Sequence, residues 1–414
     1  MLQDIMPGTE DQLNKEMTSA YIGFDPTADS LHVGNLVPIT LLMRLQRAGH
    51  KPYALVGGAT GMIGDPSGKS QERNLLDLAS IQHNSDCIRK QMEKFIDFNG
   101  SVPNAAVMVN NYDWFKDISF LSFIRDVGKH ISVNYMMAKD SVKNRLETGM
   151  SFTEFTYQLI QGYDFYHLNT TQNVRLQVGG ADQWGNIVTG TELIRRKGGS
   201  DAFAFTCRLI TKADGTKFGK SESGNVWLDR EKTSPYQFYQ FWLKMADADA
   251  VKMALVFSFK PVPEIKALTA EHETAPHLRK LQKELAEEMT IMVHSEEDLA
   301  FAKQASEILF GQSSVEVLRS LNEKQLLEVM DGVPQVTGVR DSLSAGIDII
   351  SFLADRGVFP SKGEAKKMLQ NGGISINKEK VTTLDFKLTQ EHLLNGKYLL
   401  VQKGKSNYTL AMFT

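Results

Sequence analysis

The feature that most limits the possible folds is a strand–helix–strand pattern near the start of the chain. Short apolar runs at residues 21–24 and 52–56 are bounded by turn residues, which predicts two buried strands. Between them, leucines follow a helical period over residues 36–48, and Gly49 ends that pattern. A strand, a helix and a second strand at this spacing form a βαβ unit, in which the strands run parallel.

Two further strands are predicted at residues 106–109 and 175–178. Each is followed by Gly or Asn turn signals and then by a helical pattern. The first half of the chain is therefore expected to be an α/β domain with a doubly wound, Rossmann-like parallel sheet.

The pattern changes after about residue 234. Residues 234–330 are rich in Ala, Leu, Glu and Lys, with helical spacing over 277–292 and 300–309, so an α-helical domain is expected. The Gly-Val-Pro sequence that begins residues 332–341 is typical of a linker.

The last part of the chain has mixed patterns. Residues 365–369 are helical in pattern, whereas 374–377 and 398–401 are strand-like, which predicts a small α+β domain. The chain of 414 residues is thus expected to form three domains, at residues 1–230, 231–335 and 345–414.

Composition indicates a globular protein in a reducing compartment. The apolar fraction is 42% and the charged fraction is 23%. No run approaches the roughly 18 apolar residues of a membrane span, and residues 1–5 lack the features of a signal peptide. The two cysteines, Cys87 and Cys207, are far apart, which favours the cytoplasm over a disulfide framework.

The net charge of −3 conceals an asymmetry between the two ends. Residues 351–414 hold ten Lys or Arg and five acids, so this tail is +5 and the rest of the chain is −8. An acidic body with a basic tail suggests a polyanionic partner at one end. A solvated lysine-rich surface is an equally good interpretation of the charge alone.

A polar loop joins the first predicted strand to the first predicted helix, and its residue types suit an anion. Ser30 is expected to cap the helix, whose free N–H groups and dipole favour a phosphate. Gly34 lets a nucleotide approach the backbone, and His32 can donate a hydrogen bond to a phosphate. Taken alone, a His beside a Gly is more often a satisfied surface or core residue.

A second loop brings two lysines together. Lys217 and Lys220 lie three residues apart among glycines, with Ser221 next in the chain, and mobile positive charges of this kind can close on a polyphosphate. An exposed basic turn is the better interpretation of an isolated pair.

Together the two loops resemble the HIGH and KMSKS signatures of class I aminoacyl-tRNA synthetases, in the expected order. Asn35 replaces the second histidine of the first signature, but it can still donate a hydrogen bond. Phe218 and Gly219 replace Met and Ser in the second signature, and both lysines are retained. The resemblance implies that His32, Asn35, Lys217, Lys220 and Ser221 act in ATP chemistry.

Four more segments resemble bacterial tyrosyl-tRNA synthetases, and the similarity runs along nearly the whole chain. They are residues 21–27, 56–68, 157–164 and 179–186. Tyr157, Gln161 and Asp164 fall at i, i+4 and i+7, on one face of a predicted helix. The resemblance implies that Tyr157, Gln161 and Asp65 hold the ammonium group of tyrosine, while Asp164 and Tyr21 bond its phenol. An ordinary amphipathic helix with a solvated polar face is the alternative.

The remaining site residues are also implied by the resemblance. Gln183 would lie beside the reacting carboxylate, Asp182 would bind the ribose, and Thr27 with His32 would contact phosphates. Further ATP contacts are expected at Gly23, Asp25, Gly34 and Lys220.

The implied reaction is tyrosine activation by ATP, followed by transfer of the tyrosyl group to tRNA(Tyr) in protein synthesis. Catalysis would come from positioning and charge stabilisation rather than from a protein nucleophile. Mg²⁺ is expected with the ATP substrate, although no carboxylate cluster in the sequence marks a dedicated metal site.

The tail at residues 361–377 resembles the S4 RNA-binding module. Its helix would present Lys362, Lys366 and Lys367 to a phosphate backbone. The resemblance also implies a homodimer. The apolar and aromatic segment at residues 120–135 is either the dimer interface or a core helix.

Two alternative functions are consistent with parts of the sequence. A tryptophanyl-tRNA synthetase shares the fold and the signatures, but Asp164 with Tyr21 and the S4-like tail favour tyrosine. A non-catalytic RNA-binding homologue is disfavoured by His32, Asp164 and the two signature lysines. Family members usually have more than 20 residues before the first of these strands, which leaves open whether Met1 is the natural start.

Overall fold

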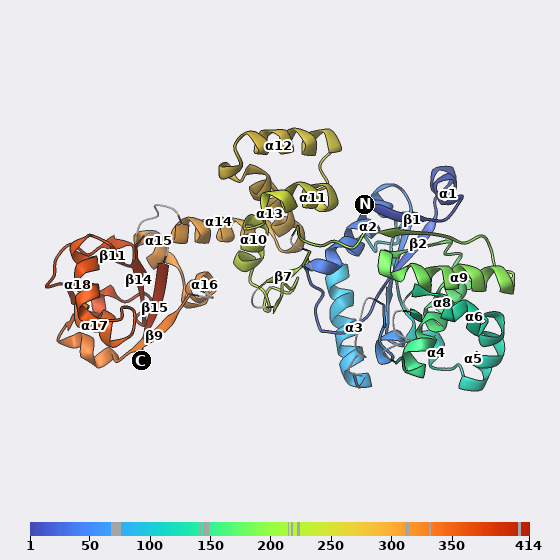
Figure 1. Ribbon diagram of the computed structural model, residues 1–414, viewed down its shortest axis with the longest axis horizontal. Coiled ribbons are helices and arrows are strands. Elements are labelled where there is room, and N and C mark those ends of the chain that lie inside the picture. Colours follow the sequence, from blue (N-terminus) through green and yellow to red (C-terminus); the bar gives the residue numbers. More distant parts are fainter. Residues whose placement is uncertain are drawn as a thin grey trace. The chain divides into compact units, whose positions relative to one another are not determined.

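The computed structural model describes most of the chain (Figure 1). The described residues are 1–67, 76–140, 142–143, 149–213, 215–216, 218–221, 224–310, 315–330, 333–404 and 407–414, with only the backbone described at 220, 221, 309 and 310. The chain divides into two compact units. Unit 1 comprises residues 1–233 and 241–293, and unit 2 comprises residues 234–240 and 294–414.

Unit 1 contains a six-stranded sheet with the order β1-β6-β5-β2-β3-β4. The strands are β1 (Leu2–Ile5), β2 (Ser19–Phe24), β3 (Lys51–Val56), β4 (Val107–Asn110), β5 (Leu176–Gly180) and β6 (Phe203–Cys207). All neighbours pair parallel except β1, which is antiparallel to β6. The four predicted parallel strands are confirmed, since each overlaps one of β2, β3, β4 and β5 with ends that differ by a residue or two, whereas β1 and β6 had not been predicted.

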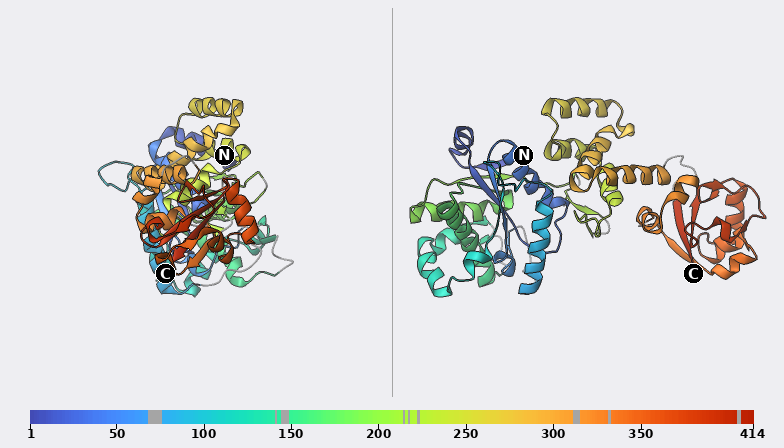
Figure 2. Two further views of the ribbon diagram at one scale, coloured as in Figure 1. Left: turned by 90° about the vertical axis from the view of Figure 1, so that its left-hand side faces the viewer. Right: turned by 180° about the vertical axis from the view of Figure 1, so that it is seen from behind.

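Helices cover both faces of this sheet, which confirms the doubly wound prediction. Figures 1 and 2 show α2 (Leu36–Arg47) and α3 (Leu78–Met92) on one side, and α8 (Phe152–Gln172) and α9 (Trp184–Lys197) on the other. The chain builds outward from β2 to β4 and then returns to β5 on the other side of β2. The carboxyl ends of β2 and β5 therefore form a topological switch point, where ligands of such sheets bind.

Helices α8 and α9 cross at two glycines. A Cβ atom on Gly190 would lie 2.9 Å from Phe165 Cβ, and one on Gly162 would lie 3.3 Å from Thr189 Cγ2. Without these side chains the two helices approach closely. This crossing places polar residues of α8 beside the first turn of α9.

Smaller helices in unit 1 include α1 (Thr9–Lys15), α4 (Tyr112–Phe115), α5 (Phe120–Asp126) and α6 (Val133–Met137). The predicted segment 120–135 has two kinds of surface. Val127 and Ile131 are buried in a core cluster, whereas Phe120 and Leu121 are 64% and 77% exposed. The segment is thus partly core, and it also offers an apolar surface.

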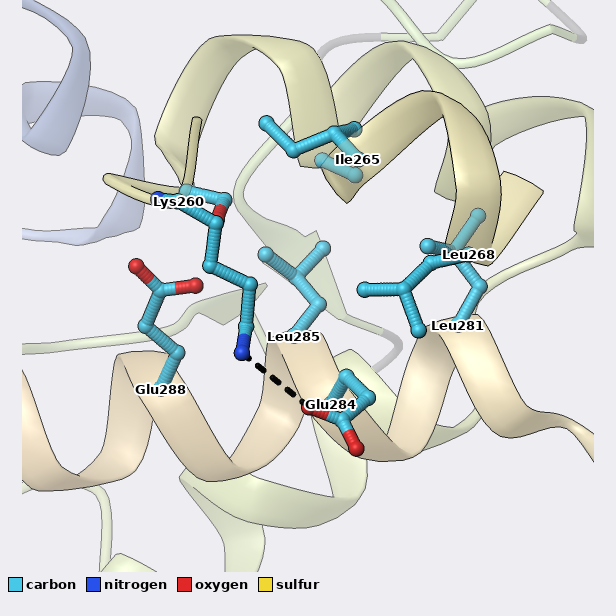
Figure 3. A pocket seen from close by; sticks show the side chains of 9 residues that line it. Lys260, Ile265, Leu268, Leu281, Glu284, Leu285 and Glu288 are labelled. Carbon is cyan, nitrogen blue, oxygen red and sulfur yellow. Dashed lines mark hydrogen bonds and ion pairs between the residues drawn. The ribbon is translucent and has the colours of Figure 1, made fainter. Parts of the chain in front are cut away.

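Residues 241–293 of unit 1 contain α11 (Asp247–Phe257), α12 (Val262–Thr274) and α13 (Lys280–Val293), in agreement with the helical prediction. A shallow hollow between them has Ile265 and Leu285 on its apolar floor (Figure 3). Lys260 Nζ lies 3.5 Å from a Glu284 carboxylate oxygen and 3.0 Å from one of Glu264. Lys260 therefore offsets only part of the negative charge at this hollow, which Glu288 also lines. Helix α10 (Pro235–Leu243) contributes residues to both units.

Unit 2 begins with α14 (Glu296–Phe310), α15 (Val315–Ser320) and α16 (Glu323–Val329). Its five-stranded sheet has the order β12-β11-β14-β15-β9. The strands are β9 (Gln335–Gly338), β11 (Ile374–Ile376), β12 (Glu379–Lys380), β14 (Tyr398–Lys403) and β15 (Asn407–Phe413), and β10 (Ile347–Asp348) pairs with β13 (Lys387–Leu388). Helices α17 (Ile349–Asp355) and α18 (Lys362–Gln370) join the sheet in one hydrophobic core.

One prediction in this region was wrong. The expected linker at 332–341 contains β9, which pairs parallel to β15, with Val336 opposite Ala411. The turn signals in the sequence precede this edge strand, and its pairing partner lies about 75 residues away, beyond the reach of a local pattern. The three-domain division stays a prediction.

Candidate active site

A cavity of about 560 Å³ opens in unit 1 at the carboxyl ends of β2 and β5. The cavity is lined by all predicted site residues of unit 1 that the structure describes beyond the backbone, together with the predicted glycines. They are Tyr21, Gly23, Asp25, Thr27, His32, Gly34, Asn35, Asp65, Tyr157, Gln161, Asp164, Asp182 and Gln183. Segments separated by more than 100 residues in the chain therefore meet around one space, at the switch point of the sheet.

The helix start at one end of the cavity is capped by His32. Its ring Nδ1 accepts the Gly34 N–H at 3.0 Å, and Asn35 Oδ1 accepts the His32 backbone N–H at 3.0 Å. Because Nδ1 is an acceptor, the neutral ring carries its proton on Nε2 and is a donor there. The Asn35 oxygen is likewise used within the turn, so its amide nitrogen is the group that can donate.

The expectation that Ser30 caps this helix was wrong. Ser30 is buried, its hydroxyl donates to the Leu31 carbonyl at 2.8 Å, and it accepts from Gln91 Nε2 at 2.9 Å. Ser30 therefore ties the loop to α3, and the His32 side chain takes the capping position two residues later.

The second signature loop lies against the first. Val33 N–H donates to the Val226 carbonyl at 2.8 Å, and Val226 N–H donates to the Gly219 carbonyl at 3.0 Å. Gly219 has a φ of +90°, and a Cβ there would lie 3.0 Å from the Gly34 nitrogen. Glycine is therefore required on conformational and steric grounds. The Phe218 side chain is buried, with its ring centroid 5.5 Å from that of Phe257.

The lysines of this loop are only partly covered by the structure. Lys217 lies outside the described residues. The backbone of Lys220 and Ser221 forms β7 (Lys220–Ser221), which pairs with β8 (Gly224–Asn225). Their predicted roles stay predictions.

At the inner end of the cavity, Asp164 is held by two donors. Asn111 Nδ2 donates to Oδ2 at 3.1 Å, and Trp114 Nε1 donates to Oδ1 at 2.9 Å. Burial raises the pKa of Asp164 to about 8, although the two donors act to lower it. The hydroxyl of Tyr21 is buried and has no hydrogen-bond partner among the described residues. Burial and the nearby Asp164 raise the pKa of Tyr21 well above its usual value.

A third group of polar residues lies around Asp65. Its Oδ1 accepts the Ser67 N–H at 2.9 Å, and its Oδ2 accepts from Gln183 Nε2 at 2.6 Å. Asn186 Nδ2 lies 3.0 Å from Gln161 Oε1 and 3.3 Å from Gln183 Oε1. Burial, followed by the neighbouring Asp65, raises the pKa of Asp182.

Tyr157 and Asp25 form a pair between these groups. The Tyr157 hydroxyl donates to Asp25 Oδ2 at 3.1 Å, and the Thr60 hydroxyl donates to Asp25 Oδ1 at 2.8 Å. Burial and then Asp25 raise the pKa of Tyr157 well above its usual value, so it is a neutral phenol. Asp25 thereby orients Tyr157, a contact that the sequence had not indicated.

Several residues of the site had not been predicted at all. Asn111, Trp114, Thr60 and Asn186 hold the predicted residues in place. Thr60 and Asn186 lie in the segments 56–68 and 179–186 that resemble the family, whereas the only signal for Asn111 was its place directly after β4. Among the described residues, no group of three or more His, Cys, Asp or Glu side chains could hold a metal ion.

In unit 2 the helix predicted to carry Lys362, Lys366 and Lys367 is confirmed as α18. Lys362, Lys366 and Lys367 are exposed on it, and the Ser361 side chain caps its start by accepting the Glu364 N–H at 3.2 Å. The Lys362 ammonium also donates to the Ser351 hydroxyl at 3.0 Å. The lysines are accessible, and their role in binding RNA stays a prediction.

A doubly wound sheet that places His32 and Gly34 at its switch point, with the Gly219 turn packed against them, is the arrangement of a class I aminoacyl-tRNA synthetase. The family of class I tRNA synthetases for tryptophan and tyrosine matches residues 13–311, and the C-terminal domain typical of tyrosine–tRNA ligases matches residues 325–411. The chain belongs to the tyrosine–tRNA ligase family.

Relatives of similar length support this assignment. The chain is 61% identical to a tyrosine–tRNA ligase of Bacteroides thetaiotaomicron, covering 99% of this chain and 96% of the relative. It is 59% identical to one of Cytophaga hutchinsonii, covering 100% and 97%. The structure resembles a C-terminally truncated mitochondrial tyrosyl-tRNA synthetase of Aspergillus nidulans with a TM-score of 0.66, at 28% identity over 75% of this chain and 91% of that one.

Within the part of the chain that the structure describes, no helix combines the length and the apolar character needed to cross a membrane.

Proposed function

We propose that this tyrosine–tRNA ligase works by direct displacement. A carboxylate oxygen of tyrosine attacks the α-phosphorus of ATP, the bond to the bridging oxygen breaks, and pyrophosphate leaves. The terminal ribose hydroxyl of tRNA(Tyr) then attacks the tyrosyl carbonyl, and AMP leaves. No side chain has to act as a nucleophile, so positioning and charge stabilisation supply the catalysis.

The observation that carries the choice of tyrosine is the pair of Tyr21 and Asp164 at the inner end of the cavity. Tyr21 has a buried hydroxyl without a partner among the described residues, and Asp164 is a buried carboxyl group. A phenol provides both a donor and an acceptor for these two groups. Phenylalanine would leave the buried Tyr21 hydroxyl unpaired and offer Asp164 no hydroxyl, which is costly, and tyrosyl-tRNA synthetases are a well-known case of this kind of selection.

The other end of the cavity suits the amino acid backbone and the nucleotide. Asp65 and the Gln161 carbonyl offer acceptors to an ammonium group, and Tyr157 closes that side. Gln183 lies beside the position of the reacting carboxylate. Thr27, His32 and Asn35 also line the cavity, and the His32 Nε2–H would donate to the phosphates.

The remaining ATP contacts are assigned by their place in the cavity or in the signature loop. Asp182 would accept hydrogen bonds from the ribose, and Gly23 and Gly34 leave room for the nucleotide. Lys217, Lys220 and Ser221 would close on the leaving pyrophosphate. Mg²⁺ would enter with ATP and neutralise part of the polyphosphate charge, because the described residues offer no dedicated metal site.

The test is pyrophosphate exchange, measured as labelled ATP formed with tyrosine, tryptophan or phenylalanine as the amino acid. Exchange is expected with tyrosine alone, and His32→Ala should reduce kcat while the KM for tyrosine changes little. Exchange with tryptophan and none with tyrosine would reassign the substrate. No exchange in a well-folded preparation would favour a non-catalytic RNA-binding protein.

We propose that α18 binds tRNA through Lys362, Lys366 and Lys367. Neutralising all three to Ala should raise the KM for tRNA and flatten its salt dependence, since each phosphate contact contributes to the salt slope. Tyrosine-dependent pyrophosphate exchange should stay unchanged in this variant. An unchanged KM for tRNA would remove α18 from the RNA interface.

We also propose a homodimer that covers the exposed apolar side chains of α5 and α6. Phe120, Leu121 and Val133 are 64%, 77% and 62% exposed, which is unusual for three large apolar residues so close in the chain. Leu121→Asp should yield monomers in sedimentation experiments, whereas a dimer that survives this change would place the interface elsewhere. The working compartment would be the cytoplasm, where tRNA and ATP are found.

A further inference from the structure

Asn186 lies at the meeting point of two site residues that come from different elements. It is 3% exposed in the first turn of α9, and its Nδ2 group faces Gln161 Oε1 of α8 at 3.0 Å. The same nitrogen lies 3.3 Å from Gln183 Oε1 and 3.3 Å from Ser67 Oγ. Asn186 does not itself line the cavity, so its effect must pass through these neighbours.

The direction of each hydrogen bond in this group follows from Asp65. A carboxylate only accepts, so Gln183 must turn its Nε2 group toward Asp65 Oδ2, at 2.6 Å. The Gln183 oxygen then faces Asn186, which must present its own nitrogen there. The two protons of that nitrogen serve the two glutamine oxygens, because a hydroxyl such as Ser67 can rotate and donate elsewhere, whereas an amide oxygen can only accept.

This arrangement also determines the orientation of Gln161. Its oxygen is held toward Asn186 Nδ2, at 3.0 Å, and an amide oxygen can accept two hydrogen bonds. The second lone pair is thus available to an ammonium group beside Asp65. If the Gln161 amide turned over, its NH₂ group would face that ammonium group and repel it.

The helix crossing makes this contact possible. A Cβ on Gly162, next to Gln161, would lie 3.4 Å from the Gly190 nitrogen of α9. At this separation a side chain as short as that of asparagine can reach from α9 to Gln161.

We propose that Asn186 is a positioning residue that fixes the amide orientation of both Gln161 and Gln183. This inference depends on the proposed function, in which Gln161 accepts from the tyrosine ammonium group and Gln183 lies beside its carboxylate. Asn186 thereby lowers the KM for tyrosine and raises kcat without touching the substrate.

The experiment compares Asn186→Leu, which removes both donors, with Asn186→Asp, which keeps the shape but can only accept. Pyrophosphate exchange should show the KM for tyrosine raised about three- to tenfold in Asn186→Leu, as expected for one lost hydrogen bond, with the KM for ATP unchanged. Asn186→Asp should be at least as impaired, since its carboxylate faces two carbonyl oxygens. Tyramine, which has the ammonium group but no carboxylate, should lose inhibitory strength in parallel.

The matched control is Asn169→Leu. Asn169 is also 3% exposed, and its Nδ2 donates to the Val174 carbonyl at 3.1 Å near the end of α8. Eight residues separate it from Gln161, which is about 12 Å along the helix. This variant should lower the thermal midpoint, as any lost buried hydrogen bond does, but leave the KM for tyrosine unchanged.

Double-mutant cycles separate positioning from a general structural effect. In a Gln161→Leu/Gln183→Leu background, Asn186→Leu should change the KM for tyrosine by less than about twofold, because its targets are gone. A full effect in that background would overturn the proposal. An unchanged KM for tyrosine in Asn186→Leu would also overturn it. A raised KM in Asn186→Asp alone would overturn it too, because it would show an effect of the added charge and not of the lost donors.

The failure of the proposed function has a different signature. If Gln161→Leu and Gln183→Leu leave the KM for tyrosine unchanged, the roles assigned to the glutamines are wrong and the proposal fails with them. If those two variants are impaired and Asn186→Leu is not, only the role of Asn186 is wrong. Should Asn186→Leu fail to fold, the nearly isosteric Asn186→Asp is used in the same cycle.

Discussion

The contact between α8 and α9 should make the tyrosine site sensitive to one added methyl group, in Gly190→Ala. The new Cβ would lie 2.9 Å from Phe165 Cβ and 3.0 Å from Phe165 Cδ1. Relaxed carbon atoms lie about 3.5 to 4.0 Å apart, so α8 has to move by roughly 0.5 to 1 Å. Phe165 is fully buried, with its ring centroid 5.4 Å from that of Tyr21, so the displacement is directed at the phenol end of the cavity.

The size of the effect follows from two opposing contributions. Overpacking of a dense core costs about 1 to 3 kcal/mol. Alanine in place of glycine within a helix returns about 1 kcal/mol. The net change is a destabilisation of about 0 to 2 kcal/mol. The shift should also raise the KM for tyrosine and leave the KM for ATP unchanged.

Gly185→Ala in the same helix is the matched control. A Cβ on Gly185 would lie 3.7 Å from Lys139 Cβ, an ordinary van der Waals contact. This variant should be neutral or up to about 1 kcal/mol more stable, with unaltered exchange kinetics. Urea unfolding measures the change in stability, and pyrophosphate exchange measures the change in KM, in the unaltered protein, Gly190→Ala and Gly185→Ala. If Gly190→Ala matched Gly185→Ala in stability and in KM, the close crossing would not control the site.

Three further predictions concern the site itself. Tyr21→Phe removes a buried hydroxyl that has no partner among the described residues, so the protein without tyrosine should gain about 1 kcal/mol of stability, while the KM for tyrosine rises. Lower stability in urea would contradict this. Burial raises the pKa of Asp164 in the folded protein to about 8, from an ordinary value of 3.8. The folded state therefore favours the neutral carboxyl group over the carboxylate. The contribution of this group to the free energy of unfolding is fully present below about pH 4. Relative to Asp164→Asn, it is lost at about 1.4 kcal/mol per pH unit as the pH rises to about 8. Parallel pH profiles of unfolding for the two proteins would refute this. Gly219→Ala combines a φ of +90° with a Cβ 3.0 Å from the Gly34 nitrogen, so kcat for exchange should fall at least tenfold, and unaltered kcat would show that the turn tolerates a side chain.

Local patterns predicted four strands of the six-stranded sheet, from β2 to β5, and missed β1 and β6, as they missed β9 in the sheet of unit 2. The strands β2 and β3, with α2 between them, are apolar and bounded by turn residues, so periodicity identifies them. The edge strand β9 has no such pattern and is a strand only because it pairs with β15. Strand formation at an edge depends on a distant partner, which composition does not reveal.

The same distinction applies to the site. Tyr157, Gln161 and Asp164 could be found because they share a helical face, and the family resemblance gave them roles. Asn111 and Trp114 could not, since their hydrogen bonds to Asp164 join residues about 50 positions apart in the chain. Residues that position other residues leave little local signal of their own.

The three residues on that face of α8 are each held by a different part of unit 1. Asp25 of the first loop accepts from Tyr157, Asn186 of α9 donates to Gln161, and Trp114 of α4 donates to Asp164. The position of tyrosine therefore depends on three separate packing contacts rather than on α8 alone. Since α8 is pressed against α9 at Gly162 and Gly190, a shift of this one helix would disturb all three hydrogen bonds together. Recognition of the phenol and orientation of the ammonium group are thus coupled through the position of a single helix.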